Sequence, residues 1–189
     1  MISMRTLIFN GSPRPKGDTA SLLRLLTPRL TGEVTVLDAY GSQISPCIDC
    51  RHCWTAADCV LQDGMQTVYD ELQRCDNVLI ASPLHYAQLT APLLGIGSRL
   101  QIYFCAGKFR GERLIQKPKR GGVILVGGGT GDPAGAFHTA EILLHDMNCQ
   151  QIHPLICSHD TDNLPAREDP KALAGLTSLA DFFNRAPGT

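Results

Sequence analysis

The sequence has no excess of either charge and no long apolar run. Lysine and arginine number 17 against 18 aspartate and glutamate residues, which leaves a net charge of -1. Nucleic-acid-binding domains usually carry a basic surface, and disordered tails usually carry a block of one charge, so neither class is indicated. No apolar stretch approaches the roughly 20 residues that cross a bilayer. We therefore expect no nucleic-acid partner and no membrane partner.

Secretory and repetitive features are also missing. Residues 1–10 carry only a short apolar stretch before Gly11 and Ser12, without the longer apolar region and cleavage site of a signal peptide. We expect a cytoplasmic protein. No internal repeat or low-complexity segment is present. A chain of 189 residues is long enough for one full-sized hydrophobic core and too short for two. We expect a single domain over residues 1–189.

Short apolar runs alternate with amphipathic stretches along the chain. The runs predict strands at 6–10, 34–37, 77–81, 123–126 and, more weakly, 150–157. In the last run Pro154 suits only an edge strand or a bulge. Helical spacing of apolar residues predicts helices at 18–30, 63–74 and 90–104, and two more begin at Asp132-Pro133 and Asp169-Pro170. This order predicts the α/β class, with a doubly wound five-stranded parallel sheet between two layers of helices.

Three loops follow predicted strands and carry unusual residues. Residues 10–19 combine glycines, hydroxyls and a helix start, which together favour a phosphate site. Residues 82–86 place His85 and Tyr86 after a proline, where an aromatic ring can stack on a flat ligand. Residues 127–131 hold four glycines, which let backbone approach a ligand closely. Ligands of open α/β sheets bind at such strand ends.

Each loop also has a simpler interpretation. The first is then a turn with a helix cap, Tyr86 of the second packs into the core, and the third is a flexible turn. No loop matches the Walker A motif or Gly-x-Gly-x-x-Gly. Without such a motif, we expect none of the three loops to hold a pyrophosphate.

Four cysteines form a separate motif inside the long irregular stretch 41–62. Cys47, Cys50, Cys53 and Cys59 have the spacing C-x2-C-x2-C-x5-C. Three thiolates at this spacing can wrap one face of an iron–sulfur cluster, and a fourth closes the site. Structural zinc more often uses two separated C-x2-C pairs. A [4Fe–4S] cluster, unmetallated thiols, zinc and disulfides all stay open as interpretations of this motif.

We expect the other four cysteines to be small buried hydrophobes: Cys75, Cys105, Cys149 and Cys157.

Taken together, the motifs resemble the flavodoxin-like NADPH-dependent FMN reductase family, nearest its iron-sulfur flavoprotein branch. Gly11-Ser12-Pro13-Arg14 and Gly17-Asp18-Thr19 match the pattern of its first loop, and residues 82–86 match its second. The resemblance implies that the FMN phosphate is held by Ser12, Arg14 and Thr19. It further implies that the isoalloxazine ring is bordered by Ser82, Pro83, Leu84, His85 and Tyr86.

The chain departs from the family pattern in places. Asp18 stands where the family has asparagine, so we expect a carboxylate beside the phosphate unless it points away. His85 replaces an aromatic residue. A lysine and an Asp-Arg pair of the family appear here as Leu94 and Ser98-Arg99. We include Asp18 and the backbone of Gly127, Gly128 and Gly129 among the cofactor-binding residues.

These observations predict an FMN-dependent oxidoreductase. NAD(P)H or a ferredoxin would donate electrons, and a small-molecule acceptor or a redox protein would take them. We assign no catalytic residue, and His85 is the only candidate near the ring. A flavin-free redox-sensing or metal-binding module built on the cysteine loop is the alternative.

The apolar stretch 93–104 predicts a homodimer or homotetramer. Because the cysteine loop follows the second strand, we expect it at the sheet's carboxyl edge, beside the flavin.

Overall fold

The fold is built on a parallel sheet in the order β2-β1-β3-β4-β5, with β6 also paired to β4. The computed structural model describes residues 4–129 and 131–185. All five strand pairings are parallel. The strands are β1 (Arg5–Asn10), β2 (Glu33–Asp38), β3 (Asn77–Pro83), β4 (Lys119–Val126), β5 (Cys149–Ile152) and β6 (Ile156–Ser158). The predicted five-position parallel sheet is confirmed.

The last position of the sheet is divided in two. β5 pairs with the start of β4 and β6 with its end, and the interruption falls at His153, Pro154 and Leu155. Pro154 has no N–H to donate to a neighbouring strand, so the ladder breaks there. This break is tolerated because the strand lies at the edge, as predicted.

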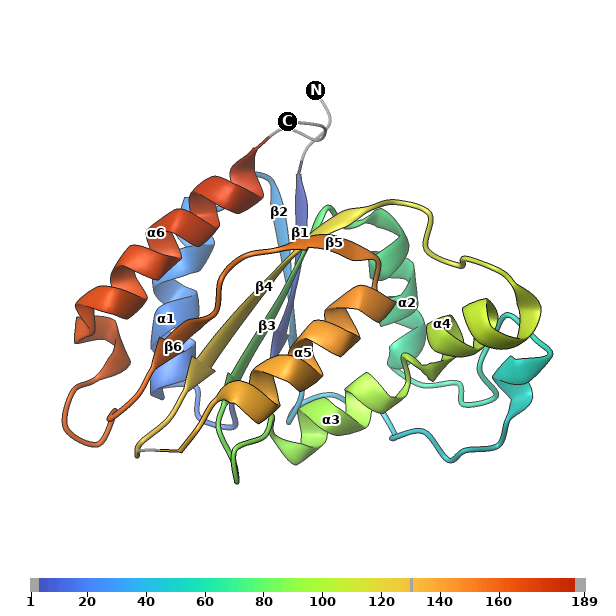
Figure 1. Cartoon of the computed structure of the whole chain (residues 1–189), viewed down its shortest axis with the longest axis horizontal. Coiled ribbons are helices and arrows are strands. Elements are labelled where there is room, and N and C mark those ends of the chain that lie inside the picture. The colour runs from blue at the N-terminus through green and yellow to red at the C-terminus, as the bar shows by residue number, and fades with distance from the viewer. Residues whose placement is uncertain (1–3, 130, 186–189) are drawn as a thin grey trace.

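Helices cover both faces of the sheet (Figure 1). They are α1 (Asp18–Leu26), α2 (Met65–Arg74), α3 (Ala91–Ser98), α4 (Gln101–Cys105), α5 (Ala134–Asp146) and α6 (Pro170–Asn184). In β1, Ile8 packs in the core under α1 and α6, whereas Leu7 and Phe9 pack in the core on the opposite face. Successive strand residues point to opposite faces, so one apolar run supplies both cores. The described part of the chain contains no helix of the length and hydrophobicity that a bilayer crossing demands.

The predicted helix at 90–104 is interrupted. α3 ends at Ser98, α4 begins at Gln101, and a π-helical turn follows at Ala106–Arg110. The break lets the segment wrap around the core, where Leu93, Ile96, Leu100 and Ile102 are buried. The premise of one helix that is apolar on all sides is therefore wrong, although Phe104 stays exposed.

We expect Asp146→Asn to stabilise the protein at neutral pH. Burial raises the pKa of Asp146 to about 6, and its place at the end of α5 sets it against the negative end of the helix dipole. The raised pKa means that the penalty is absent below about pH 4, where both states are protonated, and is complete above about pH 6. Water screens this half-buried group, so we expect about 1 kcal/mol, or roughly 2–4 °C in Tm at pH 7.5.

The measurement is thermal unfolding at pH 7.5 and at pH 4, with Asp181→Asn on the exposed face of α6 as the matched control. An equal Tm change at both pH values would contradict a titration effect.

Candidate flavin and cysteine sites

The first two strand-end loops are in direct contact. The Gly11 N–H donates to the Ala81 carbonyl at 2.8 Å, and the Thr90 hydroxyl donates to the Gly11 carbonyl at 2.9 Å. A Cβ atom on Gly11 would lie 2.9 Å from Ser82 Oγ, Thr90 Oγ1 and a Leu93 methyl. Only glycine therefore lets the loops approach this closely.

The second and third loops are also adjacent. The Leu84 N–H donates to the Val126 carbonyl at 2.8 Å, and a Cβ on Gly127 would lie 3.3 Å from a Leu84 methyl. The chain passes from β1 to β2 on one side and then to β3 on the other, so the strand order reverses at β1. The three predicted loops thus meet at the switch point of the sheet, where open α/β sheets bind ligands.

In the first loop, the start of α1 keeps its hydrogen-bond donors. Its N-cap residue is Gly17, and no side chain caps the helix. Ser12 is nearly buried, its N–H donates to Asn10 Oδ1 at 3.1 Å, and its hydroxyl accepts from the Arg14 N–H at 3.3 Å. Thr19 is buried and Arg14 is exposed. Free N–H groups at a helix start, beside a hydroxyl and a guanidinium, fit a phosphate.

Asp18 has a role that its sequence position did not show. Its Oδ1 accepts from the Ala166 N–H at 3.0 Å, which joins the first turn of α1 to the segment before α6. The carboxylate is thus engaged by a backbone N–H from 148 residues away. We expected the Asp18 carboxylate beside the phosphate unless it points away, and this hydrogen bond gives the carboxylate a different partner.

The second loop ends in a tight hairpin. His85 and Gln88 exchange backbone hydrogen bonds of 2.9 and 3.0 Å, and both residues between them have positive φ, 51° at Tyr86 and 58° at Ala87. This is the geometry of a type I′ turn. Tyr86 is fully exposed at its tip, so the alternative in which it packs into the core is wrong.

Other residues of the second loop have different surroundings. His85 is exposed, and Pro83 and Leu84 are half-buried. Ser82 is fully buried, where its hydroxyl donates to the Pro83 carbonyl at 2.8 Å and accepts from the Thr90 N–H at 3.2 Å. Ser82 therefore shapes the loop.

Backbone contacts from the end of β6 hold the third loop. The Gly127 N–H donates to the Ser158 carbonyl at 2.9 Å, and the Thr161 N–H donates to the Gly127 carbonyl at 3.1 Å. A Cβ on Gly128 would meet the Asp162 carboxylate at 2.8 Å, whereas the space beside Gly129 is open. Thr130 lies outside the described residues.

The four predicted cysteine ligands line one hollow. We call this the cysteine hollow; it has a cavity volume of about 40 Å³ and also contacts Arg99, Ile102 and Cys105. The predicted ligands in its wall are Cys47, Cys50, Cys53 and Cys59. All eight cysteines are free thiols. Within residues 4–129 and 131–185, no three His, Cys, Asp or Glu side chains are gathered closely enough to hold a single metal ion.

The cysteine hollow is not at the strand ends, which corrects the expected location. The Cys47 N–H donates to Ser98 Oγ at 2.9 Å, at the carboxyl end of α3, whereas Thr90 at the start of α3 contacts the first two strand-end loops. The cysteine segment lies beside α4, away from the strand ends (Figure 1). The helix α3, whose eight residues rise about 12 Å, has the strand-end loops at its start and the cysteine loop at its end.

The tip of the cysteine loop is anchored by residues that the motif did not reveal. The Trp54 and Phe109 rings stack with centroids 4.3 Å apart, and an Arg110 guanidinium nitrogen donates to the Cys53 carbonyl. Burial, followed by the neighbouring Cys105 thiol, raises the pKa of Cys53 to about 11. Cys105, expected only as a buried hydrophobe, therefore lies against the hollow.

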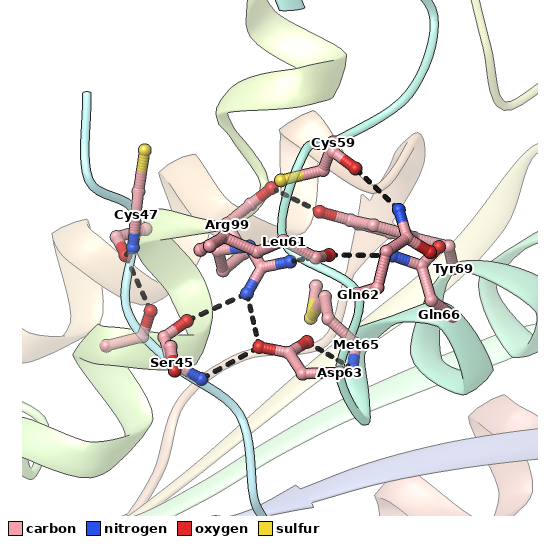
Figure 2. A network of polar contacts seen from close by, with 12 residues as sticks. Ser45, Cys47, Cys59, Leu61, Gln62, Asp63, Met65, Gln66, Tyr69 and Arg99 are labelled. Carbon is pink, nitrogen blue, oxygen red and sulfur yellow. Dashed lines mark hydrogen bonds and ion pairs between the residues drawn. The ribbon is translucent and has the colours of Figure 1, made fainter. Parts of the chain in front are cut away.

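A polar network closes the base of the loop (Figure 2). Arg99 pairs with Asp63 at 2.8 Å and donates to the Ser45 and Leu61 carbonyls at 2.9 and 3.1 Å. Burial alone would raise the pKa of Asp63, but hydrogen bonds from Arg99 and from the Met65 and Ser45 N–H groups hold it below its ordinary value. Asp63 Oδ1 also accepts from the Met65 N–H at 3.0 Å, at the start of α2.

The sequence is similar to those of known iron-sulfur flavoproteins. An iron-sulfur flavoprotein of Archaeoglobus fulgidus is 29% identical over 133 residues, which are 69% of this chain and 57% of that protein. The chain thus spans little more than half the length of that relative. An iron-sulfur flavoprotein of Methanocaldococcus jannaschii is 24% identical over 188 residues, 98% of this chain and 86% of that protein.

The fold is similar to that of a solved structure over nearly the whole chain. The NAD(P)H:quinone oxidoreductase from Methanothermobacter marburgensis superposes with a TM-score of 0.69 at 17% identity, over 97% of this chain and 96% of that one. The model of the NADPH-dependent FMN reductase family matches residues 4–155. Because this match covers well over half of the chain, the chain belongs to the NADPH-dependent FMN reductase family.

Proposed function

We propose that the three strand-end loops bind FMN and that the protein transfers electrons from NAD(P)H or a ferredoxin to a small-molecule acceptor or redox protein. The supporting observation is the mutual contact of the loops at the switch point, beside an uncapped helix start. FMN supplies the hydride and electron chemistry, and the protein supplies binding and orientation.

The chain's own residues divide into three groups around that cofactor. Ser12, Arg14, Thr19 and the free N–H groups of α1 would hold the phosphate. The exposed Tyr86 ring is free to stack on the flavin, with His85 beside it. Gly127–Gly129 would border the ring through backbone atoms. Hydride transfer at a flavin requires no acid or base from the protein, so none is assigned.

We expect Tyr86→Ala to weaken FMN binding by roughly 3–10-fold, because a stacked aromatic pair contributes about 0.5–1.5 kcal/mol. The measurement is a fluorescence titration of the flavin-free protein, with the exposed Tyr40→Ala as the matched control. Chromatography of the released cofactor distinguishes FMN from FAD. A wild-type protein that takes up no FMN at high micromolar concentration would overturn the assignment.

A second proposal is that the cysteine hollow holds a [4Fe–4S] cluster that exchanges single electrons with FMN. One tetrahedral zinc ion, with Zn–S bonds of about 2.3 Å, needs thiolates roughly 3.8 Å apart. The thiolates of a cubane each bind a different iron and so lie further apart. Four thiols around one hollow, without a group close enough for a single ion, favour the cluster.

The two proposals are separable by a visible spectrum of protein purified without oxygen. Flavin and iron–sulfur absorption are distinct, so the cofactors are counted independently. A colourless protein that binds iron or zinc but no FMN would favour the alternative, a flavin-free redox-sensing or metal-binding module.

We also propose that the protein works in the cytoplasm as a homodimer or homotetramer. Eight free thiols suit a reducing compartment. Three exposed aromatic side chains offer a surface for a second copy or a redox partner: Trp54 in the wall of the cysteine hollow, Phe109 stacked on it, and Phe104, whose ring, like that of Phe109, contacts Lys108. Exposed aromatic residues are typical of such contacts.

A further inference from the structure

Arg99 is a buried arginine whose Nε nitrogen has no hydrogen-bond partner among the described residues. Its side chain is 1% exposed, although arginine is almost never fully buried without partners. The two terminal nitrogens of the guanidinium have three acceptors, on Asp63, Ser45 and Leu61. The Nε atom itself is buried.

The partners of Arg99 lie on both stems of the cysteine loop. Ser45 precedes Cys47 by two residues, and Leu61 follows Cys59 by two residues. One guanidinium therefore joins the two ends of the segment that carries all four thiols (Figure 2). The position of Arg99 is fixed in turn, because its own carbonyl accepts from the Tyr69 hydroxyl at 3.0 Å.

The unpaired donor belongs to a side chain that lines the cysteine hollow. Arg99 shares the wall of the hollow with Cys59. A buried N–H without an acceptor is unfavourable, and native structures almost always supply a partner. A cluster bound by four thiolates is anionic, becomes more anionic on reduction, and offers sulfur acceptors. Hydrogen bonds to these sulfurs are one of the factors that set cluster potentials.

We propose that Arg99 is a positioning residue for the cluster: it holds both loop stems so that the thiols face the hollow, and its Nε–H donates to a cluster sulfur. The donated hydrogen bond stabilises the reduced, more negative state and so raises the reduction potential. This inference rests on the proposed cluster.

The test compares Arg99→Lys with wild type after anaerobic reconstitution. Lysine keeps the charge and can still pair with Asp63, but it lacks Nε and the forked donors. We expect a shift of the cluster midpoint potential to more negative values, and about 10–100-fold weaker retention of iron against a chelator. The matched control is Arg51→Lys, an exposed arginine at the same hollow, for which we expect a clearly smaller shift.

Pulsed electron paramagnetic resonance of wild type gives a readout that does not depend on whether Arg99→Lys folds. Protein grown with ¹⁵N-arginine should show a ¹⁵N coupling to the reduced cluster, and both Arg51→Lys and Arg110→Lys should retain it. Absence of the coupling overturns the inference, as does an unchanged potential in Arg99→Lys or an equal shift in Arg51→Lys. These outcomes would leave the proposal of the cluster itself intact. A wild type without iron or sulfide overturns both proposals.

Discussion

Gly11→Ala should lower FMN affinity by roughly 10–100-fold while the sheet remains folded. The new methyl group would sit 2.9 Å from Ser82 Oγ, Thr90 Oγ1 and a Leu93 methyl, all of which would have to move. Thr90 also donates to the Gly11 carbonyl, so the clash would push apart the two loops that this bond joins. Overpacking of this kind costs about 1–3 kcal/mol, and we expect much of it to appear as lost binding geometry.

Flavin titration and thermal unfolding together separate the two effects. Gly107→Ala is the matched control, because a Cβ there meets nothing within 4 Å and the residue lies in the π-helical turn, away from the strand ends. Wild-type FMN affinity in Gly11→Ala would mean that the contact between the loops does not shape the flavin site.

Cys50→Ser should lose the iron–sulfur cluster almost completely. We expect wild type reconstituted without oxygen to contain about four iron and four sulfide per chain, and the variant close to none, because a serine oxygen is a poor replacement for a thiolate. Cys50 is exposed, so stability should change little. Cys157→Ser, at a half-buried cysteine outside the hollow, is the matched control.

Iron and acid-labile sulfide are measured per chain for all three proteins. Near-zero iron in wild type would refute the cluster. Stoichiometric zinc that survives added iron and sulfide would do the same and would assign the hollow to a different metal. A full cluster in Cys50→Ser would show that another thiol replaces it, such as that of Cys105, which lines the same hollow.

Local patterns in the sequence predicted the elements and their order well. The apolar run of β1 and the cap before α6, where Asp169 accepts from the Lys171 and Ala172 N–H groups, both depend on neighbours in the chain. Burial on both faces, helix capping and proline geometry are short-range effects that leave a readable pattern. The break of the edge strand at Pro154 is of the same kind. The loop motifs were readable for that reason too, since each loop directly follows a strand.

Long-range contacts decided what the sequence left open. The apolar stretch 90–104 predicted one helix, because periodicity reports which residues are buried but not where the axis bends around a core. The Asp18 contact with Ala166 spans 148 positions, and no spacing rule connects them.

The cysteine site shows the same division most clearly. The spacing of its four cysteines predicted a shared site, since thiols close in sequence are close in space. The hollow's location, its fifth thiol at Cys105 and the unpaired Nε of Arg99 come instead from α3 and α4. Those residues meet the loop only in the tertiary structure, because burial of apolar area, which is non-directional, brings distant segments together without leaving a local pattern in either.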